Sequence, residues 1–206
     1  GRLTVGVGAG WMREEFEALD TAPYEHRGTV ANDYIRSFKE MWTSDSPEYN
    51  GTYAQVSNVS FYPKPIQDPH PPIWVGGESP PALRRAGQLG NAWYPIGNNP
   101  AFPMDTPERL AKGMATVRQH AEEAGRDPDS IDFGYSAGWY NDREEQPGRD
   151  GGRLVFTGTP EQIAGDIKEF EELGVRHLVV GLTGATPFET LERMERFANV
   201  VKPLTV

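Results

Sequence analysis

The sequence contains no cysteine among its 206 residues. This absence excludes disulfides, thiolate catalysis and cysteine-based zinc sites, and it fits a reducing cytoplasm. Basic residues are also scarce, since 20 Lys and Arg stand against 30 Asp and Glu and the net charge is −10. An acidic surface repels phosphate backbones and anionic lipids, so we expect neither a nucleic acid nor a membrane as a partner.

Long hydrophobic runs are missing as well. Apolar stretches such as Leu178 to Val180 are far too short to cross a bilayer, and no signal segment is recognisable at the start. Hydrophobic residues make up 37% and charged residues 24%, as is usual for a globular protein. We therefore expect a soluble, cytoplasmic protein.

Glycine and proline are abundant, at 23 and 18 residues, and they gather at the joints between segments. Between these joints, short apolar runs alternate with segments of helical periodicity. The predicted strands cover residues 3–7, 73–75, 92–94, 131–136 and 177–181, and the predicted helices cover residues 31–42, 79–88, 106–124, 159–173 and 187–200. This alternation predicts a parallel α/β architecture, either a doubly wound sheet or a (β/α) barrel.

One turn has the chemistry of an anion site. Gly76 and Gly77 end a buried strand, and a helix begins after Ser79 with Pro80 at its first position. Glycine lets a phosphate approach the backbone, and a helix start offers amide donors and a favourable dipole. The alternative is a glycine turn that is needed only for close packing.

Other motifs give less. The run from Gly6 to Gly10 lacks the spacing of a dinucleotide fingerprint, so we reject a Rossmann fold. No histidine has an i, i+4 partner, which leaves a helix-borne zinc site unsupported and predicts no metal. No Gly-x-Ser-x-Gly motif is present to indicate a serine nucleophile.

Three segments together resemble the luciferase-like monooxygenase family, which includes FMN-dependent monooxygenases and oxidoreductases that use the deazaflavin coenzyme F-420. The segments are residues 1–16 with Gly10-Trp11, residues 63–86 with Trp74-Val75-Gly76-Gly77, and residues 158–175 with Gly158-Thr159-Pro160-Glu161. The first segment is most similar to the deazaflavin-dependent branch. The resemblance therefore favours F-420 as the cofactor, with FMN as the alternative.

The resemblance implies an eight-stranded parallel barrel in which residues 3–7 form the fourth strand and residues 177–181 the eighth. It also implies a set of cofactor-binding residues. In this set, Gly76, Gly77 and the amide of Glu78 hold the phosphate, Gly10, Trp11 and Glu14 face the ring, and Trp93 and Ile96 flank the cofactor. The activity expected is hydride transfer or monooxygenation of a small organic substrate.

The sequence departs from the family in two places. Asn91-Ala92-Trp93 stands where relatives usually have Asp-Gly-Trp, and the first three strands of the barrel have no counterpart. We therefore expect residues 1–206 to form a single barrel domain that is truncated at its amino end, with no catalytic acid or base that can be named.

Such a truncation leaves the fourth and eighth strands as open edges. We expect a chain that is marginally stable, aggregates, or pairs with another chain, either as a homodimer or with the missing barrel half. A non-catalytic scaffold fragment is the alternative to an enzyme.

Overall fold

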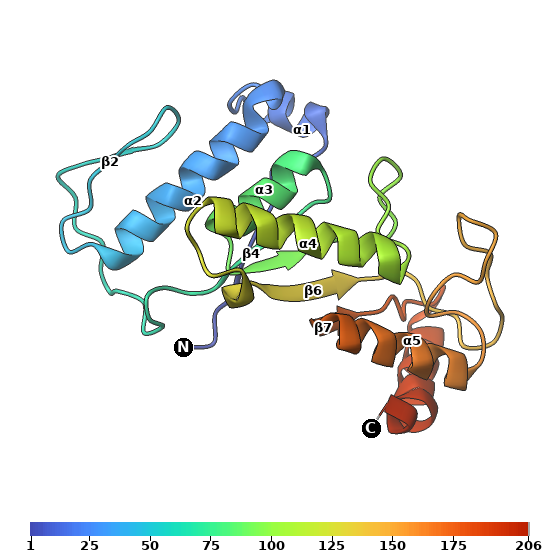
Figure 1. Ribbon diagram of the computed structural model, residues 1–206. Coiled ribbons are helices and arrows are strands. Elements are labelled where there is room, and N and C mark those ends of the chain that lie inside the picture. The colour runs from blue at the N-terminus through green and yellow to red at the C-terminus, as the bar shows by residue number, and fades with distance from the viewer. Residues whose placement is uncertain (206) are drawn as a thin grey trace. The chain divides into compact units, whose positions relative to one another are not determined.

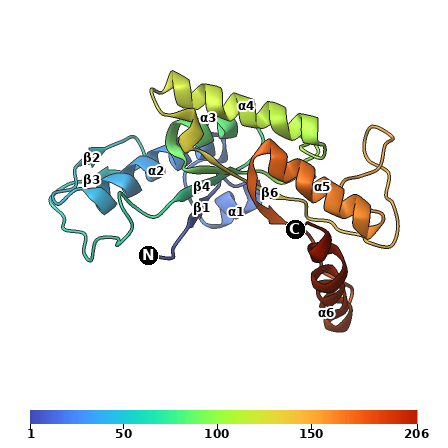
Figure 2. The same ribbon diagram turned by 60° about the horizontal axis from the view of Figure 1, so that its bottom comes forward.

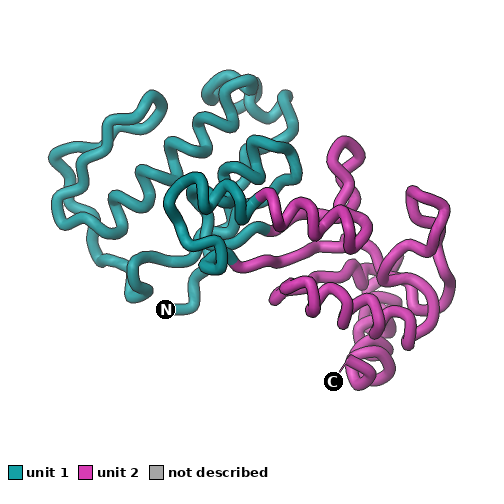
Figure 3. Tube along the Cα trace, viewed as in Figure 1, with its two compact units in different colours: residues 1–93, 117–131 teal, residues 94–116, 132–206 magenta. Residues whose placement is uncertain are grey.

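The computed structural model describes residues 1–205, and the chain divides into two compact units (Figure 3). The first unit comprises residues 1–93 and 117–131, and the second comprises residues 94–116 together with those from 132 onward. Helix α4 (Pro107–Glu123) contributes residues to both.

Within residues 1–205, five strands form one sheet. They are β1 (Val5–Val7), β4 (Ile73–Gly76), β5 (Ala92–Tyr94), β6 (Asp132–Ser136) and β7 (Val175–Val179), in the order β1-β4-β5-β6-β7. The β1–β4 and β6–β7 pairs are parallel. This confirms the predicted α/β class with a parallel sheet, and it places β1 and β7 at the two ends of the strand order, as expected.

In the first unit, α3 (Pro80–Leu89) packs against β4 and against α2 (Arg27–Thr43) (Figure 1). Arg85 of α3 is buried and joins the two helices, because its guanidinium donates to Asn32 Oδ1 and to the Gly28 carbonyl. A hairpin of β2 (Tyr49–Asn50) and β3 (Gln55–Val56) follows α2 (Figure 2).

The second unit is built around aromatic side chains. Tyr135, Phe156 and Phe170 are fully buried and make edge or tilted ring contacts with one another. Helix α5 (Pro160–Leu173) begins with a complete capping box, in which Thr159 and Gln162 satisfy each other's main-chain amides. Helix α6 (Pro187–Arg196) is followed by a π-helical turn, Phe197–Val201.

The structure differs from several of the predicted elements; α2, for example, begins at Arg27, four residues before the predicted start at residue 31. Helix α1 (Arg13–Ala18), which was not predicted, has six residues, and its N-cap, Met12, supplies no capping side chain and so gives no start signal. Strand β7 lies two residues earlier than predicted, because Gly174 ends α5 at φ +105° and pairing with β6 begins at once at Val175. The α-helical part of the last helix ends at Arg196 instead of continuing to residue 200.

Candidate cofactor site

Two glycine-containing turns follow the same end of two paired strands in the first unit. Strands β1 and β4 are parallel and in register, with Val7 opposite Val75. The turn from Gly8 to Trp11 leaves β1, and the Gly76–Gly77 turn leaves β4. Binding sites of parallel α/β proteins lie at the carboxyl ends of the strands, so these two turns occupy the position where a ligand is expected.

Gly77 is a position that only glycine fits well. Its φ is +103°, and a Cβ added there would lie 3.0 Å from the Cβ of Ala82 in α3. The Gly77 carbonyl accepts a hydrogen bond from the indole Nε1 of Trp93 at 2.9 Å. The main chain of the turn is therefore held by Trp93, and Gly77 also lets α3 pack closely against it.

The start of α3 has an unusual set of donors. Ser79 is the N-cap, and its carbonyl accepts the amides of Ala82 and Leu83 at 2.8 and 3.0 Å. Pro80 and Pro81 have no N–H, and the Ser79 hydroxyl makes no capping hydrogen bond. The candidate donors to a phosphate at this helix start are therefore the amide of Gly77 and the Ser79 hydroxyl.

The far end of α3 is bound by two cations from other elements. Lys39 Nζ donates to the Leu89 carbonyl at 2.7 Å, and Arg126 donates to the carbonyls of Gly87 and Gly90. Burial, with help from Arg126 and Arg36, lowers the pKa of Lys39 to about 8. Positive charge at the carboxyl end complements the helix dipole, and thereby stabilises α3 with its positive end at the Gly76–Gly77 turn.

The turn after β1 projects an aromatic side chain into solvent. Gly10 has φ +83°, and a Cβ there would lie 2.8 Å from the Phe16 ring. Trp11 follows with 77% of its surface exposed, and Glu14 is exposed in the first turn of α1. An exposed indole at this position is a surface on which a planar ring can stack.

The two remaining predicted residues, Trp93 and Ile96, lie outside these turns in the sequence. Trp93 lies within β5 and is fully buried, so it supports the Gly77 carbonyl from beneath instead of presenting a surface to a ligand. Ile96 belongs to the second unit, where it bridges Ser136 and is 46% exposed. Asn91, which departs from the family pattern, accepts a hydrogen bond through Oδ1 from the amide of Ile73 at 3.0 Å. It thereby satisfies the first main-chain donor of β4.

Of the predicted residues, the structure therefore brings Gly76, Gly77 and Glu78 together in one turn, with the side chain of Glu78 buried. Gly10 and Trp11 lie in the turn of the paired strand. The Ser79 hydroxyl is a further candidate donor that was not predicted, although the Ser-Pro-Pro sequence carries a signal for it. The two prolines that follow this N-cap serine have no N–H, so the first two helical positions offer its hydroxyl no amide to accept.

A family model described as luciferase-like monooxygenase matches residues 1–147. The chain belongs to this family. The sequence resemblance is thereby confirmed over more than half of the chain.

The relatives of this luciferase-like chain are longer than the chain itself. It is 26% identical to an FMNH(2)-dependent dimethylsulfone monooxygenase of Pseudomonas putida over 99% of its own length and 66% of the length of that protein. Among solved structures, it resembles monooxygenase RslO1 of Streptomyces bottropensis at a TM-score of 0.75 and 20% identity, covering 100% of this chain and 70% of that one. An F-420-dependent secondary alcohol dehydrogenase in complex with an F-420-acetone adduct matches at 0.74 and 20%, with the same coverage.

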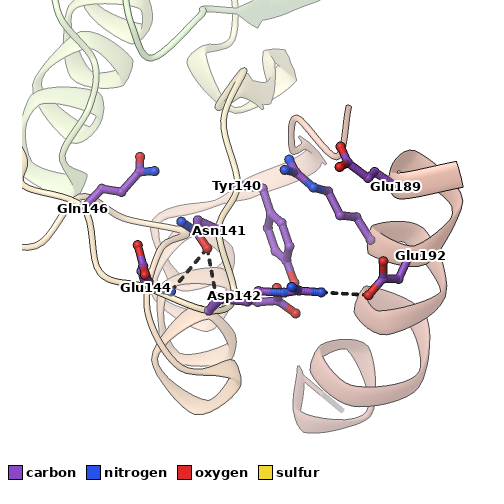
Figure 4. A pocket seen from close by; sticks show the side chains of 9 residues that line it. Tyr140, Asn141, Asp142, Glu144, Gln146, Glu189 and Glu192 are labelled. Carbon is purple, nitrogen blue, oxygen red and sulfur yellow. Dashed lines mark hydrogen bonds and ion pairs between the residues drawn. The ribbon is translucent and has the colours of Figure 1, made fainter. Parts of the chain in front are cut away.

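The second unit of this luciferase-like chain holds a cavity of about 370 Å³ after β6 and β7 (Figure 4). Its lining is charged, with four carboxylates and two guanidinium groups: Asp142, Glu144, Glu189, Glu192, Arg143 and Arg193. Arg143 pairs with Glu192 at 2.7 Å. The excess of carboxylates disfavours a phosphate in this cavity.

Within the part of the chain that the structure describes, no helix is long and apolar enough to cross a membrane. The same residues contain no group of three His, Asp or Glu placed to hold a metal ion.

Proposed function

We propose that this chain binds the phosphate of a reduced flavin-type cofactor, FMN or F-420, at the Gly76–Gly77 turn, as part of an oxidoreductase that acts on a small organic substrate. The observation that carries the proposal is the place of the Gly76–Gly77 turn, at the carboxyl end of β4, directly before the amino end of α3 and beside the turn that leaves β1. When bound, such a cofactor supplies the hydride transfer or oxygen activation, while the protein binds and orients it and excludes solvent.

The phosphate contacts follow from the donors at the turn. The amide of Gly77 and the Ser79 hydroxyl lie at the amino end of α3, where the helix dipole favours negative charge. The sequence resemblance adds the amide of Glu78. Hydrogen bonds to a charged group contribute about 1.5 to 3 kcal/mol each, so one such donor changes a dissociation constant about tenfold to a hundredfold.

The ring contacts follow from the neighbouring turn. Because β1 pairs with β4, Trp11 follows the strand next to the one that carries the phosphate turn. Its exposed indole offers the ring a stacking surface, and Glu14 lies one helical turn further on. Trp93 acts through the Gly77 carbonyl, and the place of Ile96 beside the cofactor stays a prediction.

We infer that the sheet forms the fourth to eighth strands of an eight-stranded (β/α) barrel. The support is the match over the whole chain to about 70% of two solved structures, and the two outer strands, β1 and β7. A partner strand for these edges, from a second copy or from further barrel residues, stays a prediction. So do a single domain and a cytoplasmic location.

The choice between the cofactors rests on two different similarities. The Pseudomonas putida relative is FMNH(2)-dependent by name, whereas one structural relative is named as F-420-dependent. The segment around Gly10-Trp11 favours F-420, with FMN as the alternative. Titration of the full chain with FMN, F-420 and riboflavin, followed by ligand fluorescence, tests the proposal: the phosphate-bearing ligands should bind at least about tenfold more tightly than riboflavin.

A non-catalytic scaffold is the second candidate, and the edge strands favour it. Three of the five residues of β7, namely Arg176, His177 and Val179, are exposed. If neither FMN nor F-420 binds to the full chain, the scaffold is the better description.

A further inference from the structure

Tyr24 holds the main chain of Trp11 from a position 13 residues further along the sequence. Its hydroxyl donates to the Trp11 carbonyl at 3.0 Å. Tyr24 belongs to the single turn of 3-10 helix Tyr24–His26, directly before α2. The segment between the two residues, which contains α1, therefore closes into a loop whose ends are joined by this hydrogen bond.

Three side chains fix the Tyr24 ring. The guanidinium groups of Arg13 and Arg27 lie 4.5 and 3.9 Å from its centroid, and the Phe16 ring meets it edge-on at 5.4 Å. Arg13 is itself paired with Glu25 at 2.7 Å. Cation–π and edge-to-face contacts of this kind favour one orientation of an aromatic ring, and in this orientation the hydroxyl reaches the Trp11 carbonyl.

Tyr24 and the three side chains around its ring, Arg13, Phe16 and Arg27, are called the clasp below. The clasp holds the main chain of Trp11, a residue whose side chain is largely exposed. Trp11 is 77% exposed, and the residue before it is Gly10, which lacks a Cβ and therefore has more main-chain freedom than other residues in an unrestrained turn. Holding the Trp11 carbonyl limits the directions that the indole can take. A restrained aromatic surface loses less entropy when a ring stacks on it than a free one does.

We propose that Tyr24 is a positioning residue, which fixes the main chain of Trp11 so that the indole is held ready to stack on the planar ring of the cofactor. The stacking step rests on the function proposed above, whereas the positioning of Trp11 does not. The other residues of the clasp, Arg13, Phe16 and Arg27, act by orienting the Tyr24 ring.

The test uses Tyr24→Phe, which removes the hydroxyl and keeps the ring contacts. In the full chain labelled with 5-fluorotryptophan, the Trp11 fluorine resonance is assigned by its loss in Trp11→Ala. We expect this resonance to shift or broaden in Tyr24→Phe while the other tryptophans stay in place. FMN affinity should fall about threefold to tenfold, the effect of one neutral hydrogen bond, with no change in the affinity for inorganic phosphate.

A double-mutant cycle separates positioning from general destabilisation. In a Trp11→Ala background, Tyr24→Phe should have no further effect on FMN affinity. Tyr34→Phe is the control, since Tyr34 is an exposed residue of α2 whose hydroxyl makes no hydrogen bond among the described residues, and it should change neither readout.

Three results decide the outcome. An equal loss of affinity with and without Trp11 overturns the proposal, and so does an unchanged Trp11 resonance in Tyr24→Phe. If the wild-type chain binds neither FMN nor F-420, the proposed function fails, while the fluorine resonance still decides whether Tyr24 positions Trp11.

Discussion

Replacing Gly77 by valine should weaken the binding of the cofactor phosphate. The φ of +103° disfavours any residue with a Cβ, at a cost of about 1 to 3 kcal/mol, and a β-branched residue is among the least tolerant. The new Cβ would also lie 3.0 Å from that of Ala82, so the start of α3 or the turn itself has to move. Either shift withdraws at least one donor from the phosphate, which weakens binding about tenfold to a hundredfold.

The assay is a fluorescence titration with FMN and F-420, with thermal unfolding recorded in parallel. Gly125→Val is the matched control, because Gly125 has φ +71° but nothing within 4 Å of an added Cβ. It should show the loss of stability that the positive φ alone causes, with unchanged affinity. If Gly77→Val folds and keeps the wild-type affinity, the phosphate does not bind at this turn; Gly77→Ala provides the same contact in a milder form should the valine variant fail to fold.

Ser79→Ala should weaken FMN binding about tenfold, with little change in melting temperature because the Ser79 hydroxyl makes no capping bond. Its control is Thr159→Ala, which removes a capping side chain and should cost about 1 kcal/mol of stability while FMN binding stays unchanged. Lys39 has a folded-state pKa of about 8 against 10.5 ordinarily, so the unfolded state binds its proton more tightly. The stability of the wild type relative to Lys39→Met should therefore rise between pH 8 and 10.5, and a flat difference in thermal melts would disprove this. Asp166→Asn should destabilise the second unit by about 3 kcal/mol, because buried Asp166 accepts from the Phe156 amide and pairs with Arg153. Hydrogen exchange at residues 141–158 should increase in this variant, and unchanged protection would count against the assignment.

The parts of the fold with strong local signals could be predicted from the sequence. Helix α5 carries a capping box at Thr159 and a glycine stop at Gly174, so its predicted and observed bounds agree. The bounds of strand β7 carry no comparable local signal. They are set by its pairing with β6, which is a tertiary contact. Helix α1 is too short to show periodicity, and its N-cap carries no signal.

The candidate site was predictable to a similar extent. The Gly76–Gly77 turn could be predicted because its signals, two glycines followed by a Ser-Pro helix start, are local in the sequence. The support from Trp93 to the Gly77 carbonyl joins residues 16 positions apart, and the Tyr24 hydrogen bond spans 13. Contacts of this kind depend on tertiary packing, which neither composition nor periodicity records.

The central claim is that a cofactor phosphate binds at the Gly76–Gly77 turn, and amide spectra of the full chain labelled with 15N-glycine test it most directly. On addition of FMN, the Gly76 and Gly77 amides should shift strongly, whereas riboflavin should leave Gly77 almost unchanged. Gly125, which lies away from the turn in the sequence and faces open space, should not move with either ligand. FMN binding that leaves Gly76 and Gly77 unshifted would contradict the account.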